Sequence, residues 1–295
     1  MPDARLILGI ESSCDDTAVA LVDETGAVAA ATTQSQTRIH AEWGGVFPEL
    51  ASRAHAAEII PTIKHTLALA GAGPDDIRAI AVTRGPGLIG PLMVGVNSAA
   101  GLGLAWKKPV IGVNHLRGHL LSATLDGGRV AYPALVLLVS GGHTLLARMA
   151  DPGAVEILGA SRDDSVGEAY DKVARMLGLG FPGGPAIDKL AKTGQPTIDL
   201  PRPMLHDGLD FSFSGLKAAV ARLVEREPDV DPATVAASFV AAALDVLAAK
   251  CARALATVEA ASLVVVGGVA ASPQLRARMA EICEAAGVEV ALPPL

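Results

Sequence analysis

The sequence predicts an α/β fold built as two lobes. The chain has 295 residues, which is enough for about two domains of roughly 150 residues each. Apolar residues make up 51% and charged residues 19% of the chain, a composition that supplies a buried core and argues against disorder. Short apolar runs alternate with segments of helical spacing. One pattern, an apolar run followed by a small polar turn and a second apolar run, occurs twice.

The first half opens with a predicted β-hairpin. Residues 5–10 and 18–22 are apolar runs joined by a polar segment, which is typical of two strands and a connecting turn. Residues 32–42 are polar, and 44–48 are expected to form a loop. The spacing then predicts, in order, a helix over 48–70, a strand over 77–82, a long helix over 88–106 and a strand over 109–113.

The second half repeats this opening. A strand is expected over 134–139, followed by a small polar turn and another strand. We call residues 12–17 turn 1 and residues 140–144 turn 2; an offset of 127 residues places Ser13 over Ser140. Self-similarity over half the chain predicts two related lobes, here residues 1–130 and 131–295. A strand over 262–266, a helix over 273–287 and a strand over 288–292 complete the second lobe.

Charge, cysteine content and hydropathy limit the classes of protein to which the chain could belong. The chain has 24 basic and 31 acidic residues and a net charge of −7, so it lacks the broad basic surface that supports nucleic-acid binding alone. Three widely spaced cysteines exclude a disulfide framework and a four-thiolate zinc site, and they favour a reducing cytoplasm. With no run of 18 apolar residues and no signal-peptide layout, we expect no membrane association.

Three small-residue turns follow predicted strands: turn 1, turn 2 and residues 267–270. Small residues let backbone N–H groups approach an anion, and helix starts attract phosphate. Any one of these turns is more often a plain tight turn, but together they indicate one nucleotide held between two lobes, at the strand ends. The chain has neither a P-loop nor a dinucleotide-binding motif.

His115 and His119 are four residues apart, which on a helix places both imidazoles on one face within reach of one metal ion. A pair of partly exposed helix histidines is the alternative, and the spacing alone does not decide between them. A metal would need a third ligand, for which we expect a carboxylate. Asp171 shares a predicted helix face with Gly167 and is a candidate for binding sugar hydroxyls. The alternative is that the acidic residues here only stabilise the positive end of the helix dipole.

Seven segments, in this order along the whole chain, resemble the bacterial TsaD family, formerly described as O-sialoglycoprotein endopeptidases. They are 10–17 (IESSCDDT), 84–88 (RGPGL), 114–119 (NHLRGH), 140–144 (SGGHT), 181–185 (FPGGP), 211–217 (FSFSGLK) and 266–271 (VGGVAA). The resemblance implies the two-lobed actin, sugar kinase and heat-shock ATPase (ASKHA) fold. It also implies a tRNA N6-adenosine threonylcarbamoyltransferase acting in t6A biosynthesis, on tRNAs that read codons beginning with A.

The resemblance further implies cofactors and partners. The substrate would be threonylcarbamoyl-AMP, supplied by a TsaC-like enzyme, and the acceptor would be the adenosine immediately 3′ of the anticodon in tRNA. One divalent metal is expected, with Fe²⁺ favoured and Zn²⁺ as the alternative, and ATP or ADP is a further expected ligand. The protein would work in the cytoplasm with TsaB-like and TsaE-like proteins.

Individual residues match the family's site positions. His115 and His119 match the two metal histidines. The substrate-binding positions fall on Leu138, Val139, Ser140, Gly141 and Gly142, and the nucleotide-binding positions on Asp171, Gly184 and Asp188. Ser272 stands where the family usually has Asn, and its hydroxyl is still able to donate a hydrogen bond. Asp15 or Asp16 is our candidate for accepting the proton from the attacking amine.

The family continues past Leu295 into a segment with a Thr-Asp-Asn motif, whose Asp is the third protein ligand of the metal. On this resemblance the chain is truncated before it, which predicts a weakened metal site and low or absent activity. An ATP-dependent small-molecule kinase of the same fold and a non-catalytic scaffold are the alternatives. A kinase does not need the histidine pair, and TsaB-like proteins lack it. We discount a metalloprotease, because no general base accompanies the histidines.

Four basic residues of the first half are candidates for contacts with tRNA phosphates, although each is also an ordinary solvated surface charge. They are Arg84, Lys107, Lys108 and Arg117.

Overall fold

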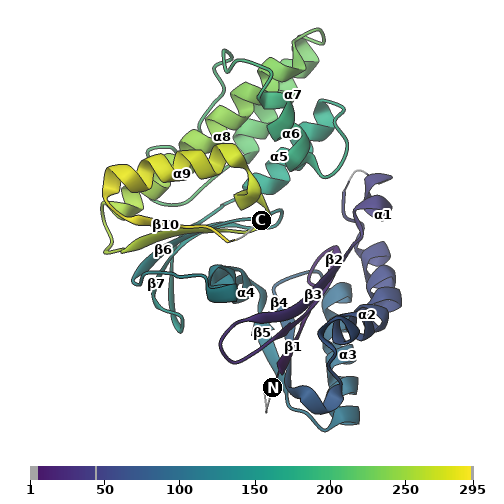
Figure 1. Cartoon of the computed structure of the whole chain (residues 1–295). Coiled ribbons are helices and arrows are strands. Elements are labelled where there is room, and N and C mark those ends of the chain that lie inside the picture. The colour runs from purple at the N-terminus through teal and green to yellow at the C-terminus, as the bar shows by residue number, and fades with distance from the viewer. Residues whose placement is uncertain (1–5, 44, 294–295) are drawn as a thin grey trace. The chain divides into compact units, whose positions relative to one another are not determined.

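The computed structural model describes residues 6–43 and 45–293. The chain divides into two compact units, residues 1–128 and 129–295, and Figure 1 shows the elements of each. We describe the units separately.

Unit 1 contains a five-stranded mixed sheet with the order β3-β2-β1-β4-β5. The predicted hairpin is confirmed, because β1 and β2 pair antiparallel with Ile10 opposite Val19. The sheet also contains an edge strand that the sequence analysis did not predict, β3, whose second half overlaps the stretch described as polar. The strands are β1 (Leu6–Glu11), β2 (Asp16–Val22), β3 (Val28–Ser35), β4 (Ile77–Gly85) and β5 (Val110–Asn114).

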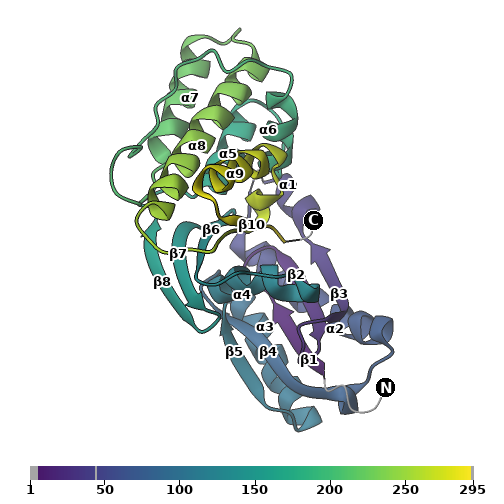
Figure 2. The same cartoon turned by 60° about the vertical axis from the view of Figure 1, so that its left-hand side comes forward.

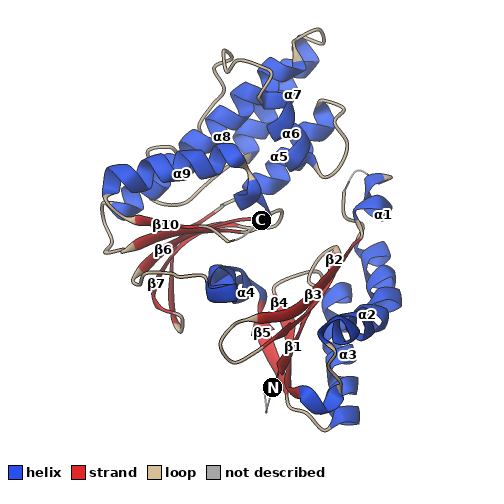
Figure 3. Ribbon diagram, in the orientation of Figure 1, coloured by secondary structure: helices blue, strands red, loops and turns tan. Residues whose placement is uncertain are grey.

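Two long helices pack on this sheet and on each other: α2 (Pro48–Ala70) contacts β2 and β3, and α3 (Ile89–Trp106) contacts β4 (Figure 3). Proline at the first position of α2 and Gly71 in the left-handed conformation after its end explain why the helix begins and stops there. Apolar side chains of α2, α3 and the sheet form the core of the unit. The short helices α1 (Thr37–Ala41) and α4 (His115–Leu121) lie at the ends of β3 and β5.

Unit 2 repeats the sheet topology of unit 1. Its order, β10-β9-β6-β7-β8, has the same pattern: a central strand pairs antiparallel with the next strand and parallel with a later one. The predicted duplication is therefore confirmed at the level of topology. The strands are β6 (Ala134–Val139), β7 (Thr144–Asp151), β8 (Ala154–Ala160), β9 (Ser262–Val266) and β10 (Glu289–Ala291).

Every residue of β6 and β9 is buried, which explains why both strands read as uninterrupted apolar runs. The helices of unit 2 surround α8, which contacts α6, α7, α9 and β6 (Figure 2). The sequence reading did not single out α8, because it is apolar on nearly every side. The helices are α5 (Val166–Met176), α6 (Gly183–Ala191), α7 (Ser214–Arg226), α8 (Pro232–Leu255) and α9 (Pro273–Ala286).

Two helices, α3 and α8, are long and apolar enough to cross a membrane by length and composition. Helix α8 is mostly buried inside unit 2, as expected of a core helix. Helix α3 packs one face on the sheet and leaves Ile89, Met93 and Leu104 exposed.

We expect Leu137→Ala to lower the free energy of unfolding by about 2–5 kcal/mol, because Leu137 lies in the middle of β6 and truncation leaves a cavity. Its side chain is 0% exposed. Urea denaturation measures the change. Ile157→Ala on β8 is the matched control, since Ile157 is 53% exposed; equal losses in the two variants would contradict the placement of this core.

Candidate functional site

In unit 1, the end of β1 meets the start of α4 at His115. Oε2 of Glu11 lies 3.1 Å from Nδ1 of His115, and Oγ of Ser13 lies 3.2 Å from the same atom. Thr83 at the end of β4 donates to Oε2 of Glu11 at 2.6 Å. A carboxylate beside Nδ1 favours the tautomer protonated there, so the lone pair of Nε2 is directed away from Glu11.

The four-residue spacing of the histidines brings their rings together. Nε2 of His119 lies 3.2 Å from Nε2 of His115, and the ring planes meet at 80°. The helix that carries both is capped by Asn114, whose side-chain oxygen accepts a hydrogen bond from N of Arg117. The predicted convergence of these two side chains is thus present.

The separation of the two Nε2 atoms fits a shared metal ion. Two nitrogen ligands, each about 2.0–2.1 Å from a tetrahedral zinc, lie about 3.3 Å apart. Glu11 behind Nδ1 is the outer-shell carboxylate that commonly orients a metal-binding histidine. Within residues 6–43 and 45–293, no group of three His, Cys, Asp or Glu side chains is arranged to hold a metal, so metal binding by the two histidines stays a prediction.

Glu11 is held in its charged form. Burial would raise the pKa of this carboxyl, but hydrogen bonds from His115, Ser13 and Thr83 lower it to about 2. The sequence reading assigned no role to Glu11 or Ser13. A sequence signal for these two residues does exist. Glu11 is an acidic residue at the end of a predicted strand, and the hydroxyl residues that follow it begin turn 1.

Asp15 and Asp16, the expected proton acceptors, lie at the other end of turn 1. Asp16 is exposed at the start of β2, and the backbone carbonyl of Asp15 accepts a hydrogen bond from N of Gln36. The contacts described above for His115 come from Glu11 and Ser13 instead. The role of the two aspartates therefore stays a prediction.

In unit 2, turn 2 connects β6 to β7. N of Ser140 donates to the carbonyl of His143 at 2.8 Å, and N of His143 donates to Oγ of Ser140 at 3.0 Å. The N–H of Ser140 is therefore used within the turn, and Gly141 and Gly142 are the exposed residues at its tip. Leu138 and Val139 are fully buried in β6, so only their backbone is available for a substrate.

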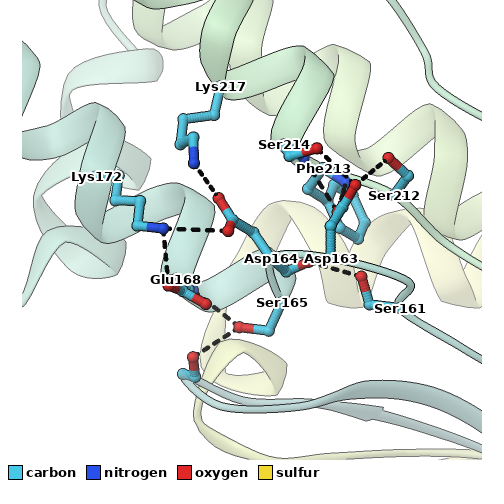
Figure 4. A network of polar contacts seen from close by, with 11 residues as sticks. Ser161, Asp163, Asp164, Ser165, Glu168, Lys172, Ser212, Phe213, Ser214 and Lys217 are labelled. Atoms are coloured by element: carbon cyan, nitrogen blue, oxygen red, sulfur yellow. Dashed lines mark hydrogen bonds and ion pairs between the residues drawn. The ribbon is translucent and has the colours of Figure 1, made fainter.

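The segment before α5 packs against turn 2 (Figure 4). Oγ of Ser165 donates to the carbonyl of Gly141 at 2.6 Å. Asp164 bonds Lys172 and Lys217, which joins this segment to α5 and α7.

Asp163, in the same segment, accepts hydrogen bonds from N of Phe213 and N of Ser214 at the start of α7. These contacts give the acidic residues before α5 a structural role.

The predicted nucleotide-binding residues lie on α5, α6 and the start of α9. Oδ1 of Asp171 accepts a hydrogen bond from N of Gly183 at 2.7 Å and so anchors the start of α6. Gly184 and Asp188 are one turn apart on α6, and a Cβ atom at Gly184 would meet nothing within 4 Å. Ser272 caps α9 and lies near enough to Asp188 to lower the pKa of its carboxyl; the structure brings these two predicted residues together.

Asp188 has a buried carboxylate oxygen that is available to a hydrogen-bond donor. It is 8% exposed, and its Oδ1 atom has no hydrogen-bond partner among the described residues. Burial raises its pKa, and the hydrogen bond with Ser272 only partly opposes this. A buried oxygen without a partner costs about 1–3 kcal/mol, which a donor such as a ligand hydroxyl would recover.

Two hollows are present in unit 2. One of about 100 Å³ lies beside turn 2 and is lined by Gly142, His143, Ser161, Ser165 and their neighbours. The other, of about 260 Å³, lies among α6, α8 and α9; none of the predicted site residues lines it.

The four basic residues proposed for phosphate contacts do not form one cluster. Lys107 and Lys108 precede β5, whereas Arg117 follows it on α4, so they lie at opposite ends of that strand. Arg84 is near the carboxyl end of β4 and packs beside Gly112.

The three cysteines are free thiols: Cys14 is exposed, and Cys251 and Cys283 are buried.

Solved structures with low sequence identity share this fold. Component A of (R)-2-hydroxyglutaryl-CoA dehydratase from Acidaminococcus fermentans aligns with a TM-score of 0.58 at 15% identity, over 98% of this chain and 91% of that one. HypF from T. kodakarensis aligns with a TM-score of 0.65 at 10% identity, over 99% of this chain and 46% of that one. With two sheets of the same topology and flanking helices, the chain has the ASKHA fold.

Sequence comparison identifies the family within that class. The profile of the family "TsaD: tRNA N6-adenosine threonylcarbamoyltransferase" matches residues 27–295. A tRNA N6-adenosine threonylcarbamoyltransferase from Burkholderia ambifaria is 49% identical over 98% of this chain and 87% of its own length, and one from Burkholderia thailandensis is 50% identical over the same shares. The chain belongs to the TsaD family of transferases.

We expect Asp188→Asn to raise the free energy of unfolding at pH 7 by about 1 kcal/mol, because it removes a buried charge. The folded-state pKa of Asp188 is raised above an unfolded value near 3.8, so the gain is complete above the folded pKa and disappears as the pH falls below about 3.8. Urea denaturation at several pH values measures it. Exposed Asp229 supplies the control Asp229→Asn; destabilisation by Asp188→Asn alone would contradict this reading.

Proposed function

We propose that this chain transfers the threonylcarbamoyl group from threonylcarbamoyl-AMP to N6 of the adenosine immediately 3′ of the anticodon of tRNA. Membership of the TsaD family supports the reaction. The observation that carries the assignment is the pairing of His115 and His119, with Nε2 atoms 3.2 Å apart and Glu11 behind His115. A kinase of the same fold has no use for this arrangement.

Unit 1 would supply the metal site. His115 and His119 would hold one divalent cation, iron or zinc, and Glu11 and Ser13 would fix the orientation of His115. When bound, the metal supplies Lewis-acid polarisation of the carbamoyl carbonyl. The expected further ligand, an aspartate of a Thr-Asp-Asn motif, stays a prediction.

Unit 2 would bind the adenylate. The exposed Gly141 and Gly142 at the tip of turn 2 allow close approach of a phosphate to the backbone. Oδ1 of Asp188 would accept a hydrogen bond from a nucleotide hydroxyl, and Ser272 would keep the carboxyl in place. Gly184, one turn before Asp188, leaves room for the ligand.

Chemistry at N6 depends on positioning, because an adenine amine is a weak nucleophile. Holding both reactants in place supplies much of the rate in such reactions. Asp15 or Asp16 would accept the proton that leaves N6 as the new N–C bond forms, and AMP departs with the electron pair of the broken bond.

We further propose that the protein works in the cytoplasm with TsaB-like and TsaE-like proteins, and that a TsaC-like enzyme supplies its substrate. The family resemblance supports these partners. The three free cysteines fit a reducing compartment.

The double variant His115→Ala, His119→Ala tests the proposal. We expect transfer of threonylcarbamoyl to tRNA to fall by more than the roughly 10–100-fold that loss of one outer-shell partner costs, because both nitrogen ligands are removed. Quantifying modified adenosine in the tRNA measures the change. His65→Ala on the exposed face of α2 is the control. Transfer as fast as that of the unchanged chain would rule out the proposed metal site.

A further inference from the structure

Both hairpin turns are hydrogen-bonded to a helix region that comes after the third strand of their unit. In unit 1 that helix is α2, which follows β3 and the short helix α1, and in unit 2 it is α5, which follows β8. The contacts are made at equivalent positions of the two turns, although the residues that make them differ.

In turn 1, the contacts come from His55 of α2, which is 0% exposed. Its Nε2 lies 3.1 Å from the carbonyl oxygen of Cys14, and its Nδ1 lies 2.7 Å from Oγ1 of Thr17. A carbonyl only accepts, so Nε2 carries the proton and Nδ1 accepts from the threonine hydroxyl. Burial lowers the pKa of His55, which agrees with this neutral form.

In turn 2, the contacts come from the start of α5. Oγ of Ser165 donates to the carbonyl of Gly141 at 2.6 Å, and N of Val166 donates to Oγ1 of Thr144 at 2.8 Å. The side chain of Ser165 also caps α5 by accepting from N of Glu168. A Cβ atom on Gly167 would lie 2.5 Å from the carbonyl oxygen of Ser140, so α5 and the turn are in direct contact.

The two sets of contacts coincide under the repeat. The offset of 127 residues that places Ser13 over Ser140 also places Cys14 over Gly141 and Thr17 over Thr144. In each turn, the carbonyl at the equivalent position accepts a hydrogen bond from the helix region. The threonine hydroxyl at the equivalent position is also hydrogen-bonded to that helix region. In unit 1 both hydrogen bonds come from the side chain of His55; in unit 2 they come from the Ser165 hydroxyl and the backbone N–H of Val166. What the two units share is a turn held at the same two positions by hydrogen bonds to a helix region.

Each restrained turn carries proposed site groups on its other side. Ser13 in turn 1 contacts Nδ1 of His115 and, through its N–H, Oε1 of Glu11. Gly141 and Gly142 in turn 2 are the proposed phosphate contacts. A shift of either turn would therefore move groups that touch the metal ligand or the substrate.

We propose that His55 and Ser165 are positioning residues, which set the metal histidine and the phosphate-binding turn respectively. The inference rests on the proposed function for the identity of the two ligands. Each residue acts through the backbone of its turn, without touching substrate.

Two variants of unit 2 test whether Ser165 positions turn 2 or only caps α5. In Ser165→Asp, the carboxylate still accepts from N of Glu168 but has no proton to donate to Gly141. Gly167→Ala keeps Ser165 and favours the helix, yet its Cβ displaces the turn. We expect both to raise KM for threonylcarbamoyl-AMP by about tenfold. Asp231→Ala is the control, since Asp231 caps α8 and has no role in our site.

For variants of unit 1, the quantity measured is the affinity for Zn²⁺. We expect His55→Gln to weaken Zn²⁺ binding by about tenfold, measured by competition with a chelating dye. Thr62→Val, a buried change on the same helix whose hydroxyl bonds only the helix backbone, is the control and should bind zinc normally.

The pattern across the two units decides the inference. It is supported if the Ser165 and Gly167 variants change KM, the His55 variant changes zinc affinity, and both controls change only the melting temperature. It is overturned if the variants lose stability but match their controls in KM and zinc affinity. Absence of transfer by the unchanged chain would be a failure of the proposed function instead, and the zinc titration would still decide the role of His55.

Discussion

The contact between Glu11 and His115 sets which ring nitrogen of His115 carries the proton and which one has the lone pair. Without a carboxylate at Nδ1, either ring nitrogen of His115 is able to carry the proton. With Glu11 there, at 3.1 Å, the proton is on Nδ1 and Nε2 offers its lone pair towards His119. Glu11 stays charged because three donors outweigh the cost of its burial. The proposed metal site would therefore depend on Glu11, which contacts Nδ1 of His115 and leaves Nε2 as the candidate metal-binding atom.

The duplication explains how one topology supports two kinds of binding. Both units have the same strand order and the same restrained hairpin turn. In unit 1 the turn is acidic and hydroxyl-rich, and it orients a histidine. In unit 2 the turn is glycine-rich, and it leaves exposed backbone at its tip. In the proposed function, the same sheet topology with different turn residues would place a cation at one turn and an anion at the other.

Much of this fold could be predicted from the sequence, because buried strands are short apolar runs bounded by turns and several helices have a clear hydrophobic period. Helix α2 was expected at the residues it occupies, and α9 was placed within one residue. Strand β3 is hard to predict because its sequence, three alanines followed by polar residues, has no apolar-polar alternation. Helix α8 is hard to predict because apolar residues occur on nearly every side of it, so it shows no preferred face. The histidine pair followed from spacing, but the roles of Glu11, His55 and Ser165 depend on contacts between residues far apart in the chain, which no local pattern encodes.

The central claim is that His115 and His119 bind one metal ion through their Nε2 atoms. X-ray absorption at the zinc edge of the zinc-loaded chain tests it most directly. The account predicts scattering from two imidazole rings with Zn–N distances of about 2.0–2.1 Å, reduced to one ring in His119→Ala. A spectrum without imidazole scattering, or one that His119→Ala leaves unchanged, would contradict it.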